Sequence, residues 1–200
     1  MFINWSRREL NLKVVYYGPA MSGKTTNLEQ IYRRMDPRRR SELVSLKTSE
    51  DRTLFFDFLQ LELGQIAGLV PKIQLYTVPG QVYYEATRKL VLNGVDGVVF
   101  VADSQPNRLK DNAESWASLQ THLRAYNLTL SAIPIVMQLN KRDLPAAISP
   151  ALLQRWINLN GQAIILATAT DGAGVLETLK AIVNGVIARV EKEMAVAPQK

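Results

Sequence analysis

The sequence predicts an α/β fold with a mostly parallel central sheet and helices on both faces. Apolar stretches of strand length alternate with amphipathic stretches of helix length along the chain. Two strand-length stretches, residues 97–103 and 133–140, are almost continuously hydrophobic, as expected where both faces of a sheet are covered. Ligands of such sheets bind at the carboxyl ends of the strands, so functional residues are expected directly after them.

The elements follow in order from these patterns. Six apolar stretches are the expected strands: residues 12–17, 54–59, 72–78, 97–103, 133–140 and 163–168. The second and third are expected to pair through the region 64–71. Four amphipathic stretches are the expected helices: residues 25–35, 107–126, 150–158 and 175–193. The 200-residue length suits one domain, which we place at residues 1–193, with 194–200 as a disordered tail.

Composition narrows the classes of protein. Apolar residues make up 47% and charged residues 21% of the chain, the balance of an ordinary globular protein. The absence of cysteine excludes disulfides, thiolate metal sites and C-terminal prenylation, and it fits a reducing cytoplasm. Phe2 excludes N-myristoylation, and no apolar run approaches the roughly 20 residues of a membrane span. We therefore expect no direct membrane anchor.

The net charge of +6 is concentrated in "RRMDPRRR", residues 33–40. Such a run could attract nucleic acid or an anionic surface. It could also be a solvated loop near bound phosphates. We favour the second interpretation, with no nucleic-acid partner, because no aromatic residues interleave the arginines as a stacking platform would require.

The strongest motif is "GPAMSGKT", residues 18–25, which matches G-x-x-x-x-G-K-[ST] in full. The glycines allow the backbone N–H groups to point at phosphate oxygens, and the helix that follows adds its positive end. Lys24 would reach the β- and γ-phosphates, and the Thr25 hydroxyl would bind Mg²⁺. The context of a strand before and a helix after predicts a single P-loop NTPase domain. The nucleotide-contacting residues expected here are Gly18, Ala20, Ser22, Gly23, Lys24, Thr25 and Thr26.

The base is indicated by "NKRD", in which Asn140, Lys141 and Asp143 follow a strand. The Asp143 carboxylate can accept hydrogen bonds from both the ring N–H and the exocyclic amine of guanine, whereas adenine would leave it unpaired. Lys141 would cover the base with its aliphatic stem, and Asn140 would tie this loop to the P-loop. A polar turn with an aspartate helix cap is the alternative. Farther along, Thr168 and Ala169 could supply a backbone N–H to the guanine carbonyl.

The stretch "LYTVPGQVYYEATRKL", residues 75–90, resembles a nucleotide switch with one substitution. Small GTPases usually have D-x-x-G-Q here, and Thr77 occupies the position of the aspartate. Gly80 would donate its N–H to the γ-phosphate, and Gln81 could orient the attacking water. Thr77 either removes an indirect Mg²⁺ contact, which would slow turnover, or merely continues the strand alternation.

A second switch is expected in "KTSEDRTLFFDFL", residues 47–59. A threonine there, Thr48 or Thr53, could close on Mg²⁺ and the γ-phosphate. Arg52 could neutralise charge between the β- and γ-phosphates, although spacing alone does not favour it over the arginines at 38–40.

Together these blocks resemble the MglA family, the Ras-like small GTPases of bacterial gliding motility and cell polarity. The likeness covers nearly the whole chain, about residues 3–189, and rests on "KVVYYGPAMSGKTTNL", "DRTLFFDFL", "LYTVPGQVYYEATRKL", "GVDGVVFVADS" and "NKRDLP". The T-x-P-G-Q variant is its most specific block, which makes Thr77 look like a family trait.

The resemblance implies a Ras-like fold, GTP/GDP and Mg²⁺ as ligands, and GTP hydrolysis stimulated by MglB, a homodimeric roadblock-fold activator. It places the intrinsic arginine at Arg52, the metal-binding switch threonine at Thr53 and the water-positioning glutamine at Gln81, which the activator realigns. Residues 55–58 and the surface around Tyr83 and Tyr84 would face the activator and polarity or motility effectors. Partners would also concentrate the cytoplasmic protein at the cell poles.

The sequence thus predicts a hydrolysing GTP switch. One alternative is a non-hydrolysing GTP-binding scaffold, suggested by Thr77. Another is a P-loop phosphotransferase acting on a small molecule, which the guanine-specifying Asn140 and Asp143 disfavour. We assign no function to His122, expected at the surface or half-buried, or to Asp103, expected to cap the turn at Ser104. Trp116 and Trp156 are expected to cover the core.

Overall fold

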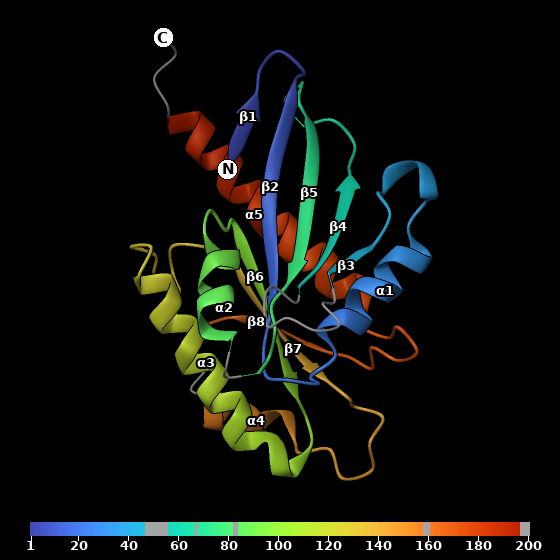
Figure 1. Cartoon of the computed structure of the whole chain (residues 1–200), viewed down its shortest axis with the longest axis vertical. Coiled ribbons are helices and arrows are strands. Elements are labelled where there is room, and N and C mark those ends of the chain that lie inside the picture. Colours follow the sequence, from blue (N-terminus) through green and yellow to red (C-terminus); the bar gives the residue numbers. More distant parts are fainter. Residues whose placement is uncertain (47–55, 67, 82–83, 158–160, 197–200) are drawn as a thin grey trace.

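The computed structural model describes residues 1–46, 56–66, 68–81, 84–157 and 161–196. Its strands form one sheet in the order β3-β4-β5-β2-β6-β7-β8, with β1 paired to the outer end of β2 (Figure 1). The pairs β5–β2, β2–β6, β6–β7 and β7–β8 are parallel, whereas β4 runs antiparallel to β3 and β5. The strands are β1 Phe2–Asn4, β2 Glu9–Tyr17, β3 Val44–Leu46, β4 Phe56–Glu62, β5 Val70–Thr77, β6 Gly97–Asp103, β7 Ile135–Asn140 and β8 Ala163–Leu166.

Helices cover both faces of this sheet (Figure 1). Side chains of α1 and α5 pack into one hydrophobic cluster, and side chains of α2, α3 and α4 into a second cluster on the other face. The α-helices are α1 Lys24–Arg34, α2 Glu85–Leu92, α3 Leu109–Arg124, α4 Pro150–Ile157 and α5 Val175–Val196, and short 3₁₀ turns span Pro37–Arg39 and Pro106–Arg108. The predicted fold class, a mostly parallel sheet between two helical layers, is confirmed.

The structure adds three elements that the sequence patterns did not predict. Strands β1 and β3 have three residues each, too few to show a period. Helix α2 has eight residues, and its buried residues Val91 and Leu92 pack in the same hydrophobic cluster as residues of α3. Helix α5 continues to Val196, so residues 194–196 are helical and not part of a tail, because Met194 still packs against the core.

The register of the parallel strands brings the predicted site residues to one edge of the sheet. Tyr17, the last residue of β2, precedes the P-loop, and Asp103 and Asn140 are paired at the ends of β6 and β7. β2 and β6 are fully buried at this end, with both Tyr17 and Phe100 at 0% exposure. The loops that follow β2, β6 and β7 therefore begin at the same edge of the sheet, from strand ends that are held in the buried core.

Candidate functional site

A cavity of about 730 Å³ opens at this edge of the sheet. Its walls are the P-loop with the start of α1, the beginning of β4, and the segment that follows β5. Its lining includes Ala20, Gly23, Lys24, Thr25, Thr26, Asp57, Thr77, Gly80, Gln81 and Tyr84. A cavity of about 760 Å³ between the end of α3 and the start of β7 is as large, but no P-loop residue lines it, so the sequence motifs point to the first.

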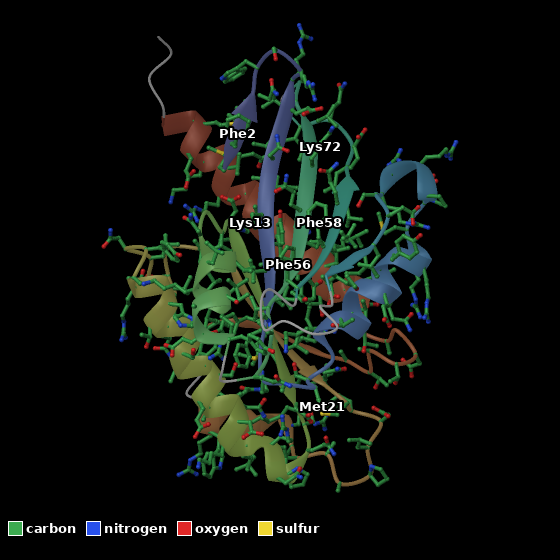
Figure 2. All side chains as sticks on the ribbon, viewed as in Figure 1. Phe2, Lys13, Met21, Phe56, Phe58 and Lys72 are labelled. Atoms are coloured by element: carbon green, nitrogen blue, oxygen red, sulfur yellow. The ribbon has the colours of Figure 1, made fainter. Side chains whose placement is uncertain are left out.

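Three P-loop residues have a positive backbone φ, and two of them are glycines, which adopt this conformation easily. Gly18 and Gly23 have positive φ angles of 146° and 102°, and an added Cβ on either would lie 2.3 Å from a neighbouring atom. Met21 also has a positive φ, 61°, which is uncommon for a residue with a side chain. Its side chain, labelled in Figure 2, is 86% exposed. The loop therefore makes this left-handed turn without glycine.

The Lys24 ammonium lies inside the curve of the loop. Its Nζ donates hydrogen bonds to the carbonyl oxygens of Gly18, at 3.0 Å, and Pro19, at 2.6 Å. Burial, followed by the positive charge of Arg88, lowers the pKa of Lys24 to about 7. The same low-dielectric surroundings strengthen its attraction for an anion placed in the cavity.

A buried carboxylate, Asp57 of β4, lies beside Thr25 and Thr77. Thr25 Oγ1 donates to Asp57 Oδ2 at 2.6 Å, and Ser45 Oγ donates to Oδ1 at 2.6 Å. Thr77 Oγ1 donates to Oδ2 at 2.9 Å and accepts from the Asp57 backbone N–H at 2.8 Å. Asp57 is 5% exposed. Thr77 thus does not leave the site without a carboxylate, because it positions one on the neighbouring strand.

Sequence reasoning missed Asp57, although a signal was present. The β4 strand "FDFLQLE" alternates between partly exposed and buried residues, and Asp57 shares the buried face with Leu59 and Leu61. A charged side chain on the inward face of an apolar strand needs partners there. That position therefore pointed to a site rather than to the core.

The donor set at Thr25 and Asp57 fits a magnesium ion. A hydroxyl and a carboxylate are the hard oxygen ligands that Mg²⁺ prefers, and this ion usually takes one or two protein oxygens beside phosphates and waters. Across the residues that the structure describes, no group of three or more His, Asp or Glu side chains could hold a metal. Thr53, the other predicted metal ligand, lies outside the described residues.

The segment after β5 rests directly on the P-loop. A Cβ on Gly80 would lie 2.2 Å from the Ala20 nitrogen, so glycine is required for this close approach. The exposed Gln81 side chain follows, and both residues line the cavity. The other predicted switch residues, Thr48, Arg52, Thr53 and Tyr83, fall outside the described part of the chain.

The basic run is not placed near the phosphate side of the cavity, contrary to expectation. None of the arginines at 33, 34 and 38–40 lines it. Arg38 pairs with Asp36 at 2.9 Å, and the Arg40 guanidinium lies 3.5 Å from the centre of the Tyr32 ring. The turn at Pro37–Arg39 is capped by Asp36, whose side chain accepts from the Arg38 N–H. The arginines at 38–40 do not line the cavity, and Arg52 lies outside the described residues, so its role stays a prediction.

Asn140 connects the P-loop to the loop after β8. Its Nδ2 donates to the Ser22 carbonyl at 2.7 Å, and its Oδ1 accepts from the Ala169 N–H at 2.9 Å. The expectation that the Ala169 N–H is directed at a guanine carbonyl is therefore not met in this structure. Ala169 is 3% exposed, so its N–H needs a partner within the protein. The neighbouring Thr168 closes the loop by donating its N–H to Ala173 O at 3.0 Å.

Lys141 and Asp143, the other two residues predicted to contact the guanine base, lie in the loop that follows β7. The backbone of Lys141 is left-handed, with φ 64°, and its Nζ is held by Asp103 Oδ2 at 2.6 Å and Gln105 Oε1 at 3.1 Å. Asp103 is fully buried and also accepts from the Gln105 N–H at 3.0 Å, so it anchors Lys141 besides shaping the turn. The Asp143 carboxylate is exposed and therefore accessible to a ligand.

His122 is buried, at 3% exposure, rather than half-exposed. It connects the P-loop strand to α2: its Nδ1 lies 3.1 Å from Tyr17 Oη, and its Nε2 lies 3.4 Å from Glu85 Oε1. The two tryptophans also differ from each other. Trp116 is 4% exposed and Trp156 is 54% exposed, so Trp156 does not cover the core as expected.

Acidification below neutral pH is expected to destabilise the fold through His122. Burial is the largest cause that lowers the pKa of His122 below its usual 6.5; Arg88 and Lys89 act in the same direction, against Glu85. Between the two pKa values the unfolded chain binds more protons, so stability is lost as pH falls from about 6.5 toward the folded pKa. Urea unfolding at pH 7.5 and 5.5 should show a larger loss for the natural chain than for His122→Gln. Equal losses would contradict this origin.

Comparison with known proteins agrees with these features. The profile of Arf, the ADP-ribosylation factor family, matches residues 1–186. The mutual gliding-motility protein MglA of Myxococcus xanthus (strain DK1622) is 50% identical over 191 residues, which cover 96% of this chain and 98% of that protein. In the described ranges, no helix combines the length and apolar character needed to cross a membrane. The chain therefore belongs to the ADP-ribosylation factor family of small GTPases, binds guanine nucleotide and hydrolyses GTP.

Proposed function

We propose that this GTPase is a magnesium-dependent switch for gliding motility or cell polarity, stimulated by an MglB-type roadblock homodimer. The observation that carries the proposal is the 50% identity to MglA over nearly the full length of both chains. The Asp57–Thr77 pair beside the P-loop supports it, because it explains how the T-x-P-G-Q block is used. Partner proteins, rather than a membrane anchor of its own, would bring the chain to the cell poles.

In the proposed site, the P-loop residues Gly18 to Thr26 hold the phosphates, and Lys24 supplies the positive charge. Mg²⁺, when bound, would neutralise phosphate charge, with Thr25 as ligand and Asp57 holding the Thr25 hydroxyl or a metal-bound water. Switch-loop Thr53 would complete the metal site. Asn140, Lys141, Asp143 and the loop at Thr168 and Ala169 would form the guanine site, in which Ala169 acts through Asn140.

For hydrolysis, Gln81 would orient the attacking water, and Gly80 would donate its N–H to the γ-phosphate. Arg52 would neutralise developing charge. Since Gly80 rests against Ala20 in this structure, the 80–81 segment has a defined starting position beside the γ-phosphate end of the loop. An activator that moves this segment by a small distance could align Gln81 without inserting a residue of its own.

The partner surface would be the aromatic end of the sheet face formed by β4 and β5, which none of the described helices covers (Figure 1). Phe56, Phe58 and Tyr76 lie in contact there, with ring centroids 5.9 Å and 5.0 Å from Tyr76. Phe56 also lines the nucleotide cavity, so a protein on this face would contact both a switch and the nucleotide pocket. Figure 2 shows Phe56 and Phe58 at this end, with Lys13 level with Phe58 and Lys72 farther along the face. The Lys13 ammonium lies 4.8 Å from the centre of the Tyr76 ring.

Single-turnover hydrolysis with and without a purified MglB-type protein tests the proposal. We expect faster phosphate release with the activator, and we expect Gln81→Leu to lose that stimulation while GTP affinity stays within about twofold, because Gln81 acts on water and not on ground-state binding. A rate that no MglB-type protein changes would refute the activator. Unchanged stimulation in Gln81→Leu would refute the role of Gln81 alone.

A further inference from the structure

Helix α1 carries a stripe of three polar side chains, Asn27, Gln30 and Arg34, to which the hydrolysis reaction gives no role. Their spacing of three and four residues places them on one face of the helix. Asn27 is 0% exposed and Gln30 is 7% exposed, so both need hydrogen-bond partners inside the protein. The contacts of all three lead to the loop after β8, residues 168–174.

Gln30 and Arg34 hold the tip of this loop directly. Gln30 Nε2 donates to the Thr170 carbonyl at 2.9 Å, and Arg34 Nη2 donates to the Asp171 carbonyl. Gly172, which is buried and has a φ of 86°, lies against the Arg34 guanidinium, and a Cβ at this position would collide with it. The Arg34 side chain is itself exposed, so it covers the turn of the loop.

Asn27 supports the end of the loop through a buried series of hydrogen bonds. Its side-chain amide and that of Gln138 in β7 bond to each other in both directions, at 2.8 and 2.9 Å. Gln138 Nε2 also donates to Thr178 Oγ1 at 2.9 Å, and Thr178 Oγ1 donates to the Gly174 carbonyl at 2.6 Å. All three side chains are 0% exposed. Because removing any one would leave the others unpaired, this end of the loop is fixed relative to α1.

Asn140 holds the same loop from the base side. Its Oδ1 accepts from the Ala169 N–H at 2.9 Å, and its Nδ2 donates to the Ser22 carbonyl of the P-loop at 2.7 Å. The loop is thus fastened to Asn140 on one side and to α1 on the other. The carbonyls that Gln30 and Arg34 hold belong to the two residues directly after Ala169. Loss of these contacts would therefore let the loop move away from Asn140.

We propose that Gln30 and Arg34 are positioning residues of the guanine site, which hold the loop after β8 against Asn140 and thereby slow the release of GDP. Both act through Ala169 and Asn140 and not by contact with the nucleotide. This role rests on the proposed assignment of the loop to the guanine site. It also gives a function to one arginine of the basic run at 33–40, whose arginines do not line the cavity beside the P-loop.

The dissociation rate of a ribose-labelled fluorescent GDP from the full chain tests this role. Gln30→Met keeps the length of the side chain but removes the donor, and it should speed release about threefold. Arg34→Ala should speed release about fivefold and the double variant at least about tenfold, because each substitution removes one hydrogen bond to the loop. Arg33→Ala is the matched control. It removes the other basic residue of the last turn of α1, with the same effect on the helix dipole, and should leave release unchanged.

Two further measurements separate positioning from a general loss of stability. Amide hydrogen exchange of Ala169, followed by NMR in the GDP-bound chain, should be faster in Arg34→Ala than in the natural chain and unchanged in Arg33→Ala. The rate at which bound GTP is hydrolysed in a single turnover should stay within about twofold in Arg34→Ala, because the phosphate side of the site is not altered.

The proposal is overturned if Arg34→Ala releases GDP at the rate of the natural chain, or no faster than Arg33→Ala does. Because the Arg34 side chain is exposed, Arg34→Ala remains informative if Gln30→Met does not fold. Asp143→Asn shows which assignment has failed. If it speeds GDP release while Arg34→Ala does not, only the positioning role is wrong. If neither substitution has an effect, the proposed guanine site is wrong as well.

Discussion

Replacing Asp143 with asparagine is expected to lower the affinity for GTP by at least about 10²-fold and to raise the affinity for xanthosine triphosphate. The Asp143 carboxylate can accept from both guanine donors, whereas an amide presents one acceptor and one donor. One guanine N–H group would then face another donor in a partly desolvated site, which costs the energy of an unmade charged hydrogen bond. Xanthine has a carbonyl in place of the guanine amine, so it complements the new amide. Competition against a fluorescent GDP analogue would measure both changes.

The matched control is Asp171→Asn, which makes the same change of charge on the neighbouring base-side loop. The carboxylate of Asp171 is exposed, and it accepts from the Ala173 N–H at 2.8 Å within its own loop. Its substitution should therefore leave the preference for guanine unchanged. If Asp143→Asn retained full GTP affinity, the base would have to be recognised elsewhere, and the "NKRD" turn would be a structural cap after all.

Motifs that depend on local backbone geometry were predicted closely from the sequence. The P-loop needs glycines where the backbone φ is positive and a helix directly after it, and both requirements are visible in eight consecutive letters. The parallel strands were predictable for a related reason: because both faces are buried, the only polar residues in β6 and β7 are Asp103, Gln138 and Asn140. Asn140 is the last residue of β7 and contacts Ser22 because parallel strands end at one edge.

The features that sequence reasoning missed depend on pairing between distant residues. Asp57 and Thr77 are 20 positions apart. Asp57 was assigned no role from the sequence, and Thr77 alone could be interpreted as a continuation of the strand alternation. The antiparallel pairing of β4 with β5 places the Asp57 N–H 2.8 Å from Thr77 Oγ1, and only this register makes them a unit. The Ala169 N–H was likewise assigned to the ligand because its bond to Asn140 spans 29 positions.

The same pairing bears on the alternative that Thr77 suggested, a scaffold that binds GTP without hydrolysis. The chain belongs to a family of GTP hydrolases, and the buried carboxylate of Asp57 lies where it can influence the Thr25 hydroxyl. Thr77 therefore indicates that the site has its carboxylate, Asp57, on the adjacent strand β4 and not on β5. This interpretation can be separated from simple loss of the aspartate by exchanging the two side chains.

Asp57→Thr is expected to weaken Mg²⁺-dependent GTP binding by about 10- to 100-fold, the usual effect of removing a residue that orients a metal ligand. The double exchange Asp57→Thr with Thr77→Asp keeps one carboxylate and one hydroxyl in the pair, and it should recover a large part of the loss. Magnesium titrations of GTP binding, followed by fluorescence, would compare the natural chain, Asp57→Thr and the double exchange. Without magnesium, the GTP affinities of these three proteins should differ much less.

Asp96→Asn is the matched control, since Asp96 is a buried carboxylate remote from the nucleotide cavity. It pairs with the amino group of Met1 at 2.6 Å and accepts from the Lys13 N–H at 2.8 Å. Its loss should lower the free energy of unfolding but leave the magnesium dependence of GTP binding unchanged. The decisive comparison is the double exchange. If it binds magnesium and GTP as poorly as Asp57→Thr, a carboxylate cannot act from position 77, and the view that the two positions are interchangeable must be abandoned. If Asp57→Thr itself leaves the magnesium dependence unchanged, the coupling of Asp57 to the metal must be abandoned.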